Sequence, residues 1–223
     1  MANIHGIRPG NDILMVGSGN VGVIVSYQMM QAGSRVAAVI DAAPKIGGYA
    51  VHAAKIARVG VPFMMSHTIK EAYGKGRVQG ATIIQVDDSW QPIPGTEKRF
   101  DIDTICIAVG LNPMTQLLRM AGCKMAYVPA LGGRTPAHDI NLETSIKDIY
   151  VAGDISGIEE ASTAIIEGRI VGLAIAHSLG YLDEKAFMEQ RDQQYEGMQG
   201  LRSGSHGERR GKAKKYLNAM MKG

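Results

Sequence analysis

The sequence is poor in cysteine and in aromatic residues. Its 223 residues include two cysteines and 5% aromatic residues. Cys106 and Cys123 lie 17 positions apart and form no CxxC pair, which excludes a zinc or iron–sulfur site built only from cysteines of this chain and a redox pair of the thioredoxin type. We predict no metal site, and we expect a cytoplasmic setting in which both thiols have packing roles.

Long apolar runs are also missing. No run approaches the roughly 18 residues that a membrane-spanning helix needs, and residues 1–11 lack the apolar core of a signal peptide. We therefore expect neither a membrane span nor a secretory leader. With 45% apolar residues and 28 glycines, the chain can still bury a substantial core and form many tight turns between strands and helices.

Excess positive charge is confined to the C-terminal tail. The formal net charge is +3, while from residue 202 onward seven Lys and Arg residues accompany one Glu. So small a net charge does not indicate a nucleic-acid-binding protein. One face of a predicted tail helix carries Ala213, Tyr216, Leu217, Met220 and Met221. This amphipathic pattern indicates either a solvated terminal helix or a docking helix for a partner subunit.

The first hundred residues predict a β-α-β unit followed by a β meander, because apolar runs of strand length alternate with a helical period. The expected elements are a strand over 13–16, a helix to about residue 32, a strand over 35–41, a helix over 48–58 and a short strand near residue 63. From residue 68 to 109, extended runs separated by Gly and Pro turns predict an antiparallel meander.

A glycine-rich loop joins the first strand to the first helix. It consists of Gly17, Ser18, Gly19, Asn20, Val21 and Gly22, with the pattern GxGxxG. The first glycine of such a loop allows the sharp turn, the second lets a pyrophosphate approach the backbone, and the third lets helix and strand pack closely. The helix N-terminus then presents unpaired amides to the phosphates. The loop predicts a dinucleotide site, although a turn of this shape that packs without a ligand is the alternative.

Asp41 indicates which nucleotide the loop binds. It ends the second strand, 19 residues beyond Gly22, where its carboxylate can accept hydrogen bonds from the hydroxyls of an adenosine ribose. A carboxylate at this place repels a 2′-phosphate, so the sequence favours NAD. Lys45 lies nearby and keeps NADP open as an alternative.

Two later segments resemble a known family. They are TICIAVGLNP, residues 104–113, and TSIKDIYVAGDISGIEEASTAIIEGRIVG, residues 144–172. In the second segment, the apolar run over 149–152 predicts a short strand that leads into Gly153 and Asp154. Both resemble the C-terminal flavin signatures of the two-dinucleotide-fold flavoprotein oxidoreductases, the group of glutathione reductase and thioredoxin reductase. Within it, the sequence is most similar to the FAD/NAD-binding alpha subunits of sarcosine oxidase, opine oxidase, hydrogen cyanide synthase and dye-linked proline dehydrogenase. The resemblance covers roughly residues 11–182.

The resemblance implies a second cofactor site, for FAD. In that family the acid of a Gly-Asp pair accepts a hydrogen bond from a ribityl hydroxyl, and the helix that follows points its N-terminus at the isoalloxazine ring. The resemblance thus assigns Asp154 as the flavin acid and Gly153 as the glycine that lets the cofactor come close. The alternative is a strand that ends in a turn with a solvated Asp. The other residues assigned to the flavin site are Ala161, Ser162 and Thr163 at the helix N-terminus and Gly110 on the adenosine side.

One half of the expected flavin domain has no counterpart in this sequence. Family members begin with a GxGxxG unit for FAD, whereas this sequence opens at the unit that resembles their inserted NAD domain. We therefore expect a separate chain to supply the N-terminal half of the FAD site, with a truncated sequence as the alternative. The fold class is α/β. The expected domains are a Rossmann-like NAD-binding domain with the meander over 1–110, the C-terminal part of a FAD-binding domain over 111–182 and a basic helical tail over 183–223.

The implied function is that of one component of a heteromeric FAD-dependent oxidoreductase complex. While an amine or amino acid is oxidised, electrons would pass between the flavin and either NAD or a partner subunit. That subunit would oxidise the substrate or carry an iron–sulfur cluster. The alternatives are ATP in place of NAD and a scaffold role without catalysis, whereas the lack of CxxC disfavours a disulfide reductase. No acid–base residue is assigned. His52 and His67 are interpreted as packing or surface residues, although the segment GGYAVHAAK, residues 47–55, could face the nicotinamide. Residues 132–139 are interpreted as a flexible loop next to the flavin region, and its His138 could touch substrate or a neighbouring redox subunit.

Overall fold

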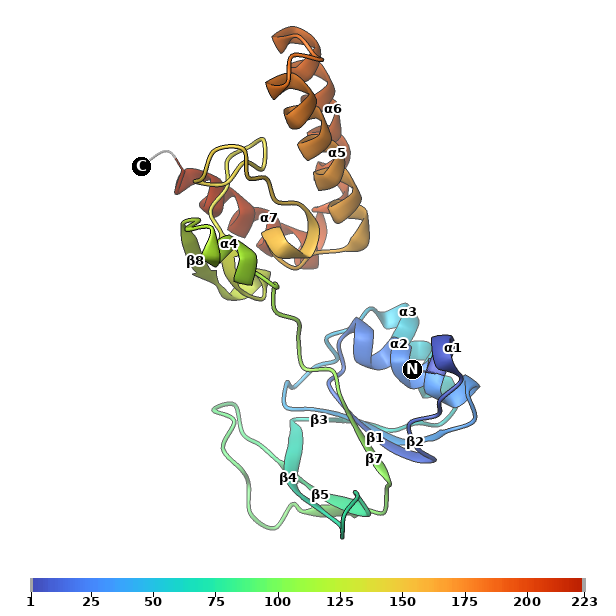
Figure 1. The fold of residues 1–223 in the computed structure, drawn as a ribbon. Coiled ribbons are helices and arrows are strands. Elements are labelled where there is room, and N and C mark those ends of the chain that lie inside the picture. The colour runs from blue at the N-terminus through green and yellow to red at the C-terminus, as the bar shows by residue number, and fades with distance from the viewer. Residues whose placement is uncertain (1, 222–223) are drawn as a thin grey trace. The chain divides into compact units, whose positions relative to one another are not determined.

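The computed structural model describes residues 2–221. The chain forms two compact units, unit 1 over residues 1–110 and unit 2 over residues 111–223 (Figure 1). Each unit buries hydrophobic clusters of its own. Among residues 2–221, no helix combines the length and the apolarity needed to cross a membrane.

Unit 1 is an α/β unit in which a parallel sheet is covered on both faces. Its helices are α1 (Ala2–His5), α2 (Asn20–Gln31) and α3 (Ala50–Arg58). The parallel sheet has the order β3-β2-β1-β7 and consists of β1 (Asp12–Val16), β2 (Arg35–Asp41), β3 (Phe63–Met65) and β7 (Thr104–Ile107). The antiparallel sheet has the order β4-β5-β6 and consists of β4 (His67–Tyr73), β5 (Gly80–Gln85) and β6 (Lys98–Phe100). In Figure 1 the helices lie on one face of the parallel sheet and β4 and β5 on the other.

The apolar run of β1 explains this layering. Leu14 packs into the cluster shared with the antiparallel sheet, and Met15 packs into the cluster under the helices. The sequence of a strand that is buried on both faces is a continuous apolar run, and β1 has such a sequence. Because β1 and β2 are parallel, with Val16 opposite Ile40, the glycine loop and Asp41 emerge at the same edge of the sheet.

The last run of the predicted meander belongs to the other sheet. Phe100 in β6 pairs with Ala81 of the antiparallel sheet, but Thr104 in β7 pairs in parallel with Ile13. The Asp103 carboxylate explains the switch, because it accepts hydrogen bonds of 2.9–3.1 Å from the amides of Asn11 and Asp12. These bonds tie the start of β7 to the start of β1, so the prediction of a single meander over 68–109 was wrong at its end.

Unit 2 is mainly helical. Its elements are α4 (Gln116–Met120), β8 (Met125–Val128), the 3-10 turn η1 (Pro129–Leu131), β9 (Gly133–Pro136), the 3-10 turn η2 (Gly153–Ser156), α5 (Ala161–Ser178), α6 (Glu184–Leu201) and α7 (Gly204–Ala219). The strands β8 and β9 form an antiparallel pair. In Figure 1, α5 and α6 lie side by side, and they contact each other along their length.

Two segments of unit 2 differ from their predictions. Residues 132–139 are not a flexible loop, because β9 lies within them and Ala137 and His138 are almost fully buried. Residues 149–152 are not a regular strand. Among residues 2–221 they pair on one side only, through the bridge between Glu143 and Tyr150 and the bond from Val151 N–H to Leu142 O. This pairing is too short to form a regular strand.

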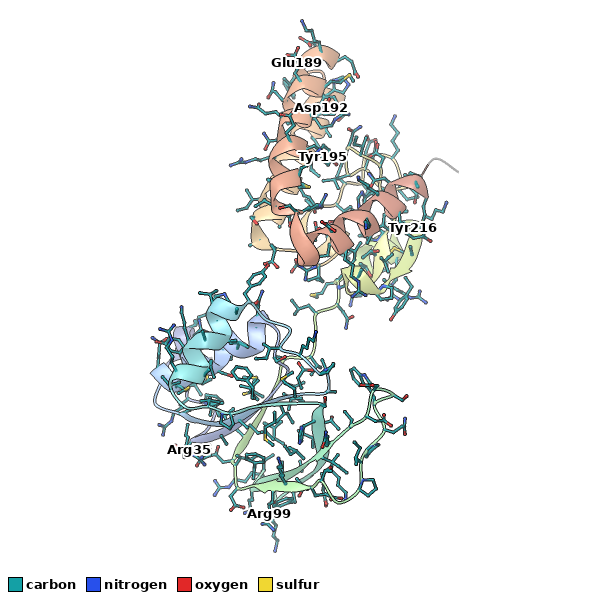
Figure 2. All side chains as sticks on the ribbon, turned by 180° about the vertical axis from the view of Figure 1, so that it is seen from behind. Arg35, Arg99, Glu189, Asp192, Tyr195 and Tyr216 are labelled. Atoms are coloured by element: carbon teal, nitrogen blue, oxygen red, sulfur yellow. The ribbon has the colours of Figure 1, made fainter. Side chains whose placement is uncertain are left out.

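The tail helix α7 contributes to the core of unit 2. Leu217 is fully buried against Val128 and Leu131, and Ala213 packs beside it. Tyr216, on the predicted apolar face and labelled in Figure 2, is instead 56% exposed. The tail is therefore neither a fully solvated helix nor a helix whose whole apolar face is free to dock.

Replacement of Leu217 by alanine should lower the free energy of unfolding by about 2–5 kcal/mol, because it leaves a cavity in a closed core. The matched change Tyr216→Ala removes a larger but exposed side chain and should cost under about 1 kcal/mol. Urea unfolding followed by the helical circular dichroism signal measures both. Equal losses in the two variants would show that α7 does not pack into unit 2.

Candidate functional site

The glycine loop of unit 1 has the local geometry that a dinucleotide cradle requires. Gly17 has φ +108°, and a Cβ atom there would lie 2.2 Å from the Ala108 carbonyl oxygen. A Cβ atom on Gly22 would lie 2.1 Å from the Gly17 carbonyl oxygen. Gly19 differs, because a Cβ atom there would meet no atom within 4 Å. The first and third glycines are thus needed by the fold, while the second borders open space, as approach of a pyrophosphate would need.

The Asp41 carboxylate is joined directly to the glycine loop. Its Oδ2 atom accepts hydrogen bonds of 2.7 Å from both Ser18 N–H and Ser18 Oγ–H, and its Oδ1 atom accepts one of 2.9 Å from Ala43 N–H. An ionised carboxylate offers about four acceptor positions. Three of them are used within unit 1, which leaves capacity for about one ribose hydroxyl.

The glycine pair that opens the segment GGYAVHAAK packs against this loop, a contact that was not predicted from the sequence. Gly47 N–H donates to Ser18 Oγ at 3.1 Å, and Gly48 N–H donates to Ser18 O at 2.8 Å. Tyr49 N–H donates to Asn20 Oδ1 at 2.8 Å. The signal was the Gly-Gly pair just before α3, because only small residues allow two backbone segments to approach so closely.

The N-terminus of α2 faces the same loop. Gly19 is its N-cap, and no side chain caps the first turn. The uncapped amides carry the positive end of the helix dipole, which favours an anion. Val21 lies on this first turn and is 51% exposed. Unit 1 therefore brings together Asp41 and the six predicted loop residues.

Unit 2 holds the Gly-Asp turn. Gly153 has φ +72°, in the left-handed region that favours glycine. Its N–H donates to Glu167 Oε2 at 2.8 Å. The Asp154 side chain that follows is exposed, and its carboxylate forms no hydrogen bond or ion pair with any residue among 2–221. The turn thus presents an available acceptor.

The start of α5 lies beside this turn. A Cβ atom on Gly153 would lie 3.3 Å from Ala164 Cβ. Ala161 and Ser162 are exposed, whereas Thr163 is buried and its hydroxyl donates to Glu160 O at 2.7 Å. Ala161 and Ser162 can face a cofactor, whereas Thr163 mainly stabilises the first turn of α5 through this hydrogen bond. Gly110, with φ +126°, is the last residue of unit 1.

A buried ionic cluster under the Gly-Asp turn was missed in the sequence. Glu167 and Lys214 are 2% and 3% exposed, and Lys214 Nζ lies 2.9 Å from Glu167 Oε1. Burial raises the pKa of Glu167, but the Lys214 ammonium and the hydrogen bonds from Ser156 and Gly153 outweigh it and hold that pKa below its usual range. The one available signal was a Glu within the apolar stretch AIIEGRIV.

The thiols and the buried histidine form no hydrogen bond with the predicted site residues within the described part of the chain. Cys123 packs with Val151 and Ile155, on either side of the Gly-Asp turn. Burial raises the pKa of the Cys106 thiol, which disfavours a reactive thiolate, and Cys123 belongs to the other unit. His138 Nδ1 lies 3.0 Å from Asp139 O, while Nε2 has no partner within the described part of the chain. A cavity of about 1090 Å³ in unit 2 is lined by His138, Tyr195 and Lys214, and by none of the predicted flavin residues.

Comparison with known proteins agrees with this geometry. The family model described as pyridine nucleotide-disulphide oxidoreductase matches residues 3–168. The chain belongs to this family. Membership confirms the resemblance predicted from the sequence, and the family is one that binds FAD and NAD(P).

Two curated relatives are components of larger enzymes. The A subunit of opine oxidase from Rhizobium meliloti (strain 1021) is 28% identical over 194 residues, which cover 79% of this chain and 41% of that protein. The HcnB subunit of hydrogen cyanide synthase from Pseudomonas aeruginosa is 26% identical over 186 residues, which cover 76% of this chain and 40% of that protein. The chain thus spans well under half the length of these relatives.

Solved structures support the fold. Thioredoxin reductase of T. acidophilum is 25% identical, with a TM-score of 0.64, over 75% of this chain and 52% of that chain. Thioredoxin reductase of Lactococcus lactis has the same TM-score at 18% identity, over 78% of this chain and 54% of that chain. The predicted α/β fold class with a parallel sheet and a helical C-terminal part is confirmed.

Replacement of Gly19 by alanine should leave the fold intact and weaken NADH binding by about tenfold or more, because the methyl group enters the space that a pyrophosphate would use. Gly22→Ala is the contrasting change and should disturb the fold, because its methyl group meets backbone. Thermal melting and calorimetric titration with NADH measure both effects. Unchanged NADH affinity in Gly19→Ala would remove this loop from the nucleotide site.

Proposed function

We propose that this chain is one component of a heteromeric FAD-dependent oxidoreductase. Unit 1 binds NAD at the loop of residues 17–22 and at Asp41, and unit 2 contributes Asp154 and the N-terminus of α5 to a FAD site. The observation that carries the proposal is the Asp154 carboxylate, which follows a left-handed glycine and has no partner among residues 2–221. When bound, flavin and nicotinamide supply the redox chemistry, and the protein positions them.

The NAD part of the proposal is supported by the division of roles among the glycines. Gly17 and Gly22 are required by close backbone contacts, but Gly19 has no steric reason within unit 1 to lack a side chain. A ligand that approaches the backbone there explains the glycine. The Asp41 carboxylate at the edge of the same loop favours a free ribose 2′-hydroxyl over a 2′-phosphate.

The FAD part is supported by the open side of the Gly-Asp turn. Residues 149–152 pair with 142–144 on one side, and no described residue forms a ladder with their other side. A parallel sheet would normally flank such a segment in an α/β nucleotide fold. We propose that a polypeptide segment outside residues 1–223 provides this flank and the pyrophosphate cradle of the flavin.

The substrate and the partners are proposed from the relatives. The A subunit of opine oxidase, the HcnB subunit of hydrogen cyanide synthase and the alpha subunit of sarcosine oxidase from Corynebacterium sp. (strain P-1) are subunits by name. By analogy, this chain would serve an assembly that oxidises an amine or amino acid. A second subunit would bind that substrate, and electrons would pass between the flavin and NAD or a further redox subunit.

A scaffold role is the second candidate, and one observation favours it. Three hydrogen bonds from Ser18 and Ala43 already occupy Asp41, and the backbone of Gly47 and Gly48 lies against the glycine loop. These contacts stabilise the loop without any nucleotide. Stopped-flow mixing of the assembly with NADH separates the candidates, because bleaching of the flavin requires electron transfer and its absence would favour the scaffold.

Replacement of Asp154 by asparagine should lower the FAD content of the assembly isolated from its native cell by about tenfold or more, because a charge-assisted hydrogen bond to the flavin is lost. Asp154 is exposed, so the fold of unit 2 should be unaffected. Mass spectrometry of the released cofactors measures the occupancy.

Glu196→Gln provides the matched control, because Glu196 is an exposed acid of the same unit with no ion pair among the described residues. Its FAD content should equal that of the wild type. An assembly that contains no FAD in the wild type, or that keeps FAD fully in Asp154→Asn, would refute the flavin assignment.

A further inference from the structure

The shape of the Gly-Asp turn depends on one buried carboxylate. Glu167 Oε2 accepts the Gly153 N–H at 2.8 Å and lies 2.7 Å from Ser156 Oγ. The Ser156 hydroxyl also lies 2.7 Å from Gly153 O and donates to one of these two oxygens. A single carboxylate on α5 therefore connects both ends of the turn that presents Asp154.

The position of Glu167 is in turn set by a lysine from the tail helix. Lys214 Nζ donates to Glu167 Oε1 at 2.9 Å and contacts Ser156 twice, at 3.0 Å from the carbonyl oxygen and 2.5 Å from the hydroxyl oxygen. An ammonium group has three donors, and all three are used here. Lys214 is 3% exposed, so its ammonium group is almost fully removed from bulk solvent.

Arg202 assists but does not duplicate this role. Its Nη2 atom lies 3.2 Å from Glu167 Oε1, while its two shorter bonds, of 3.1 and 2.5 Å, go to Glu159. Arg202 makes no bond to Ser156 within the described part of the chain, and Lys214 makes two. Lys214 is thus the cation that contacts both the carboxylate and the turn.

We propose that Lys214 is a positioning residue for the cofactor acid. It keeps Glu167 ionised and oriented, Glu167 holds the Gly153 amide in the left-handed conformation, and this conformation directs the Asp154 carboxylate outward. The inference rests on the proposed function of Asp154 in FAD binding. It assigns to the C-terminal helix, 60 residues beyond Asp154 in the sequence, a part in forming the flavin site.

The test replaces Lys214 by methionine, which keeps the length and the apolar stem but removes the charge. Glu167 then lacks its main counter-ion, and a buried charge left without its partner is strongly destabilised. We expect hydrogen exchange of the Gly153 amide in the full chain to become at least about tenfold faster. This readout requires no flavin, so it examines the turn alone.

The same variant is then placed in the native assembly, where FAD content is measured by mass spectrometry. We expect FAD occupancy to fall in Lys214→Met. The matched control is Lys212→Met, on the same helix, because Lys212 is exposed and forms no hydrogen bond or ion pair within residues 2–221. It should keep wild-type amide exchange and wild-type FAD content.

A double variant distinguishes positioning from general damage to the fold. Glu167→Gln combined with Lys214→Met removes both charges, which avoids an unpaired buried ion, and leaves an amide carbonyl that can accept the Gly153 N–H. Amide exchange and FAD content should both return toward wild-type values. This variant also decides the question if Lys214→Met alone does not fold, because failure of the double variant to recover either value would overturn the proposal.

The failures of the two proposals can be told apart. A wild-type assembly without FAD would overturn the proposed function and, with it, the role of Lys214 toward the flavin. A wild-type assembly that contains FAD, together with a Lys214→Met assembly that keeps the same FAD content and the same Gly153 exchange, would overturn the role of Lys214 alone.

Discussion

Two buried charges of opposite sign, Glu167 on α5 and Lys214 on α7, face each other at 2.9 Å in unit 2. Loss of either partner would leave a buried ion uncompensated, at a cost of about 3–5 kcal/mol. The pair therefore couples α7 to α5 and to the Gly-Asp turn more strongly than an exposed ion pair would. Leu217 adds apolar contacts one turn away. A basic tail that resembles a solvated segment in composition is in this way an integral part of unit 2.

Two acids of this chain illustrate opposite uses of a carboxylate. Asp41 is held by Ser18 and Ala43 and stabilises the loop that it borders. Asp154 has no such partner among the described residues, and the hydrogen bonds of its turn go to Glu167 instead. An acid that stabilises its own loop can be retained without a ligand, whereas the exposed Asp154 carboxylate stays available to one. Unit 1 therefore fits both a binding and a scaffold role, and Asp154 is available for the flavin role proposed for it.

The fold was predictable where local pattern decides structure. The run Ile13–Met15 and the glycine loop give β1, the turn and α2, because burial on both faces and left-handed glycines leave clear signals. The separation of β7 from the meander was not predictable, since it depends on Asp103 reaching Asn11 and Asp12 across about ninety residues. The site was predictable for motif residues, but the ionic cluster was not, because no periodicity pairs Glu167 with Lys214.

The pairing of residues 149–152, which within residues 2–221 is limited to one side, has a consequence for how the protein is produced. Unpaired backbone donors and acceptors at the edge of an extended segment can bond to another extended chain, including a second copy. If a further polypeptide segment pairs with this edge, as proposed above, its presence during synthesis would protect the edge from such self-association.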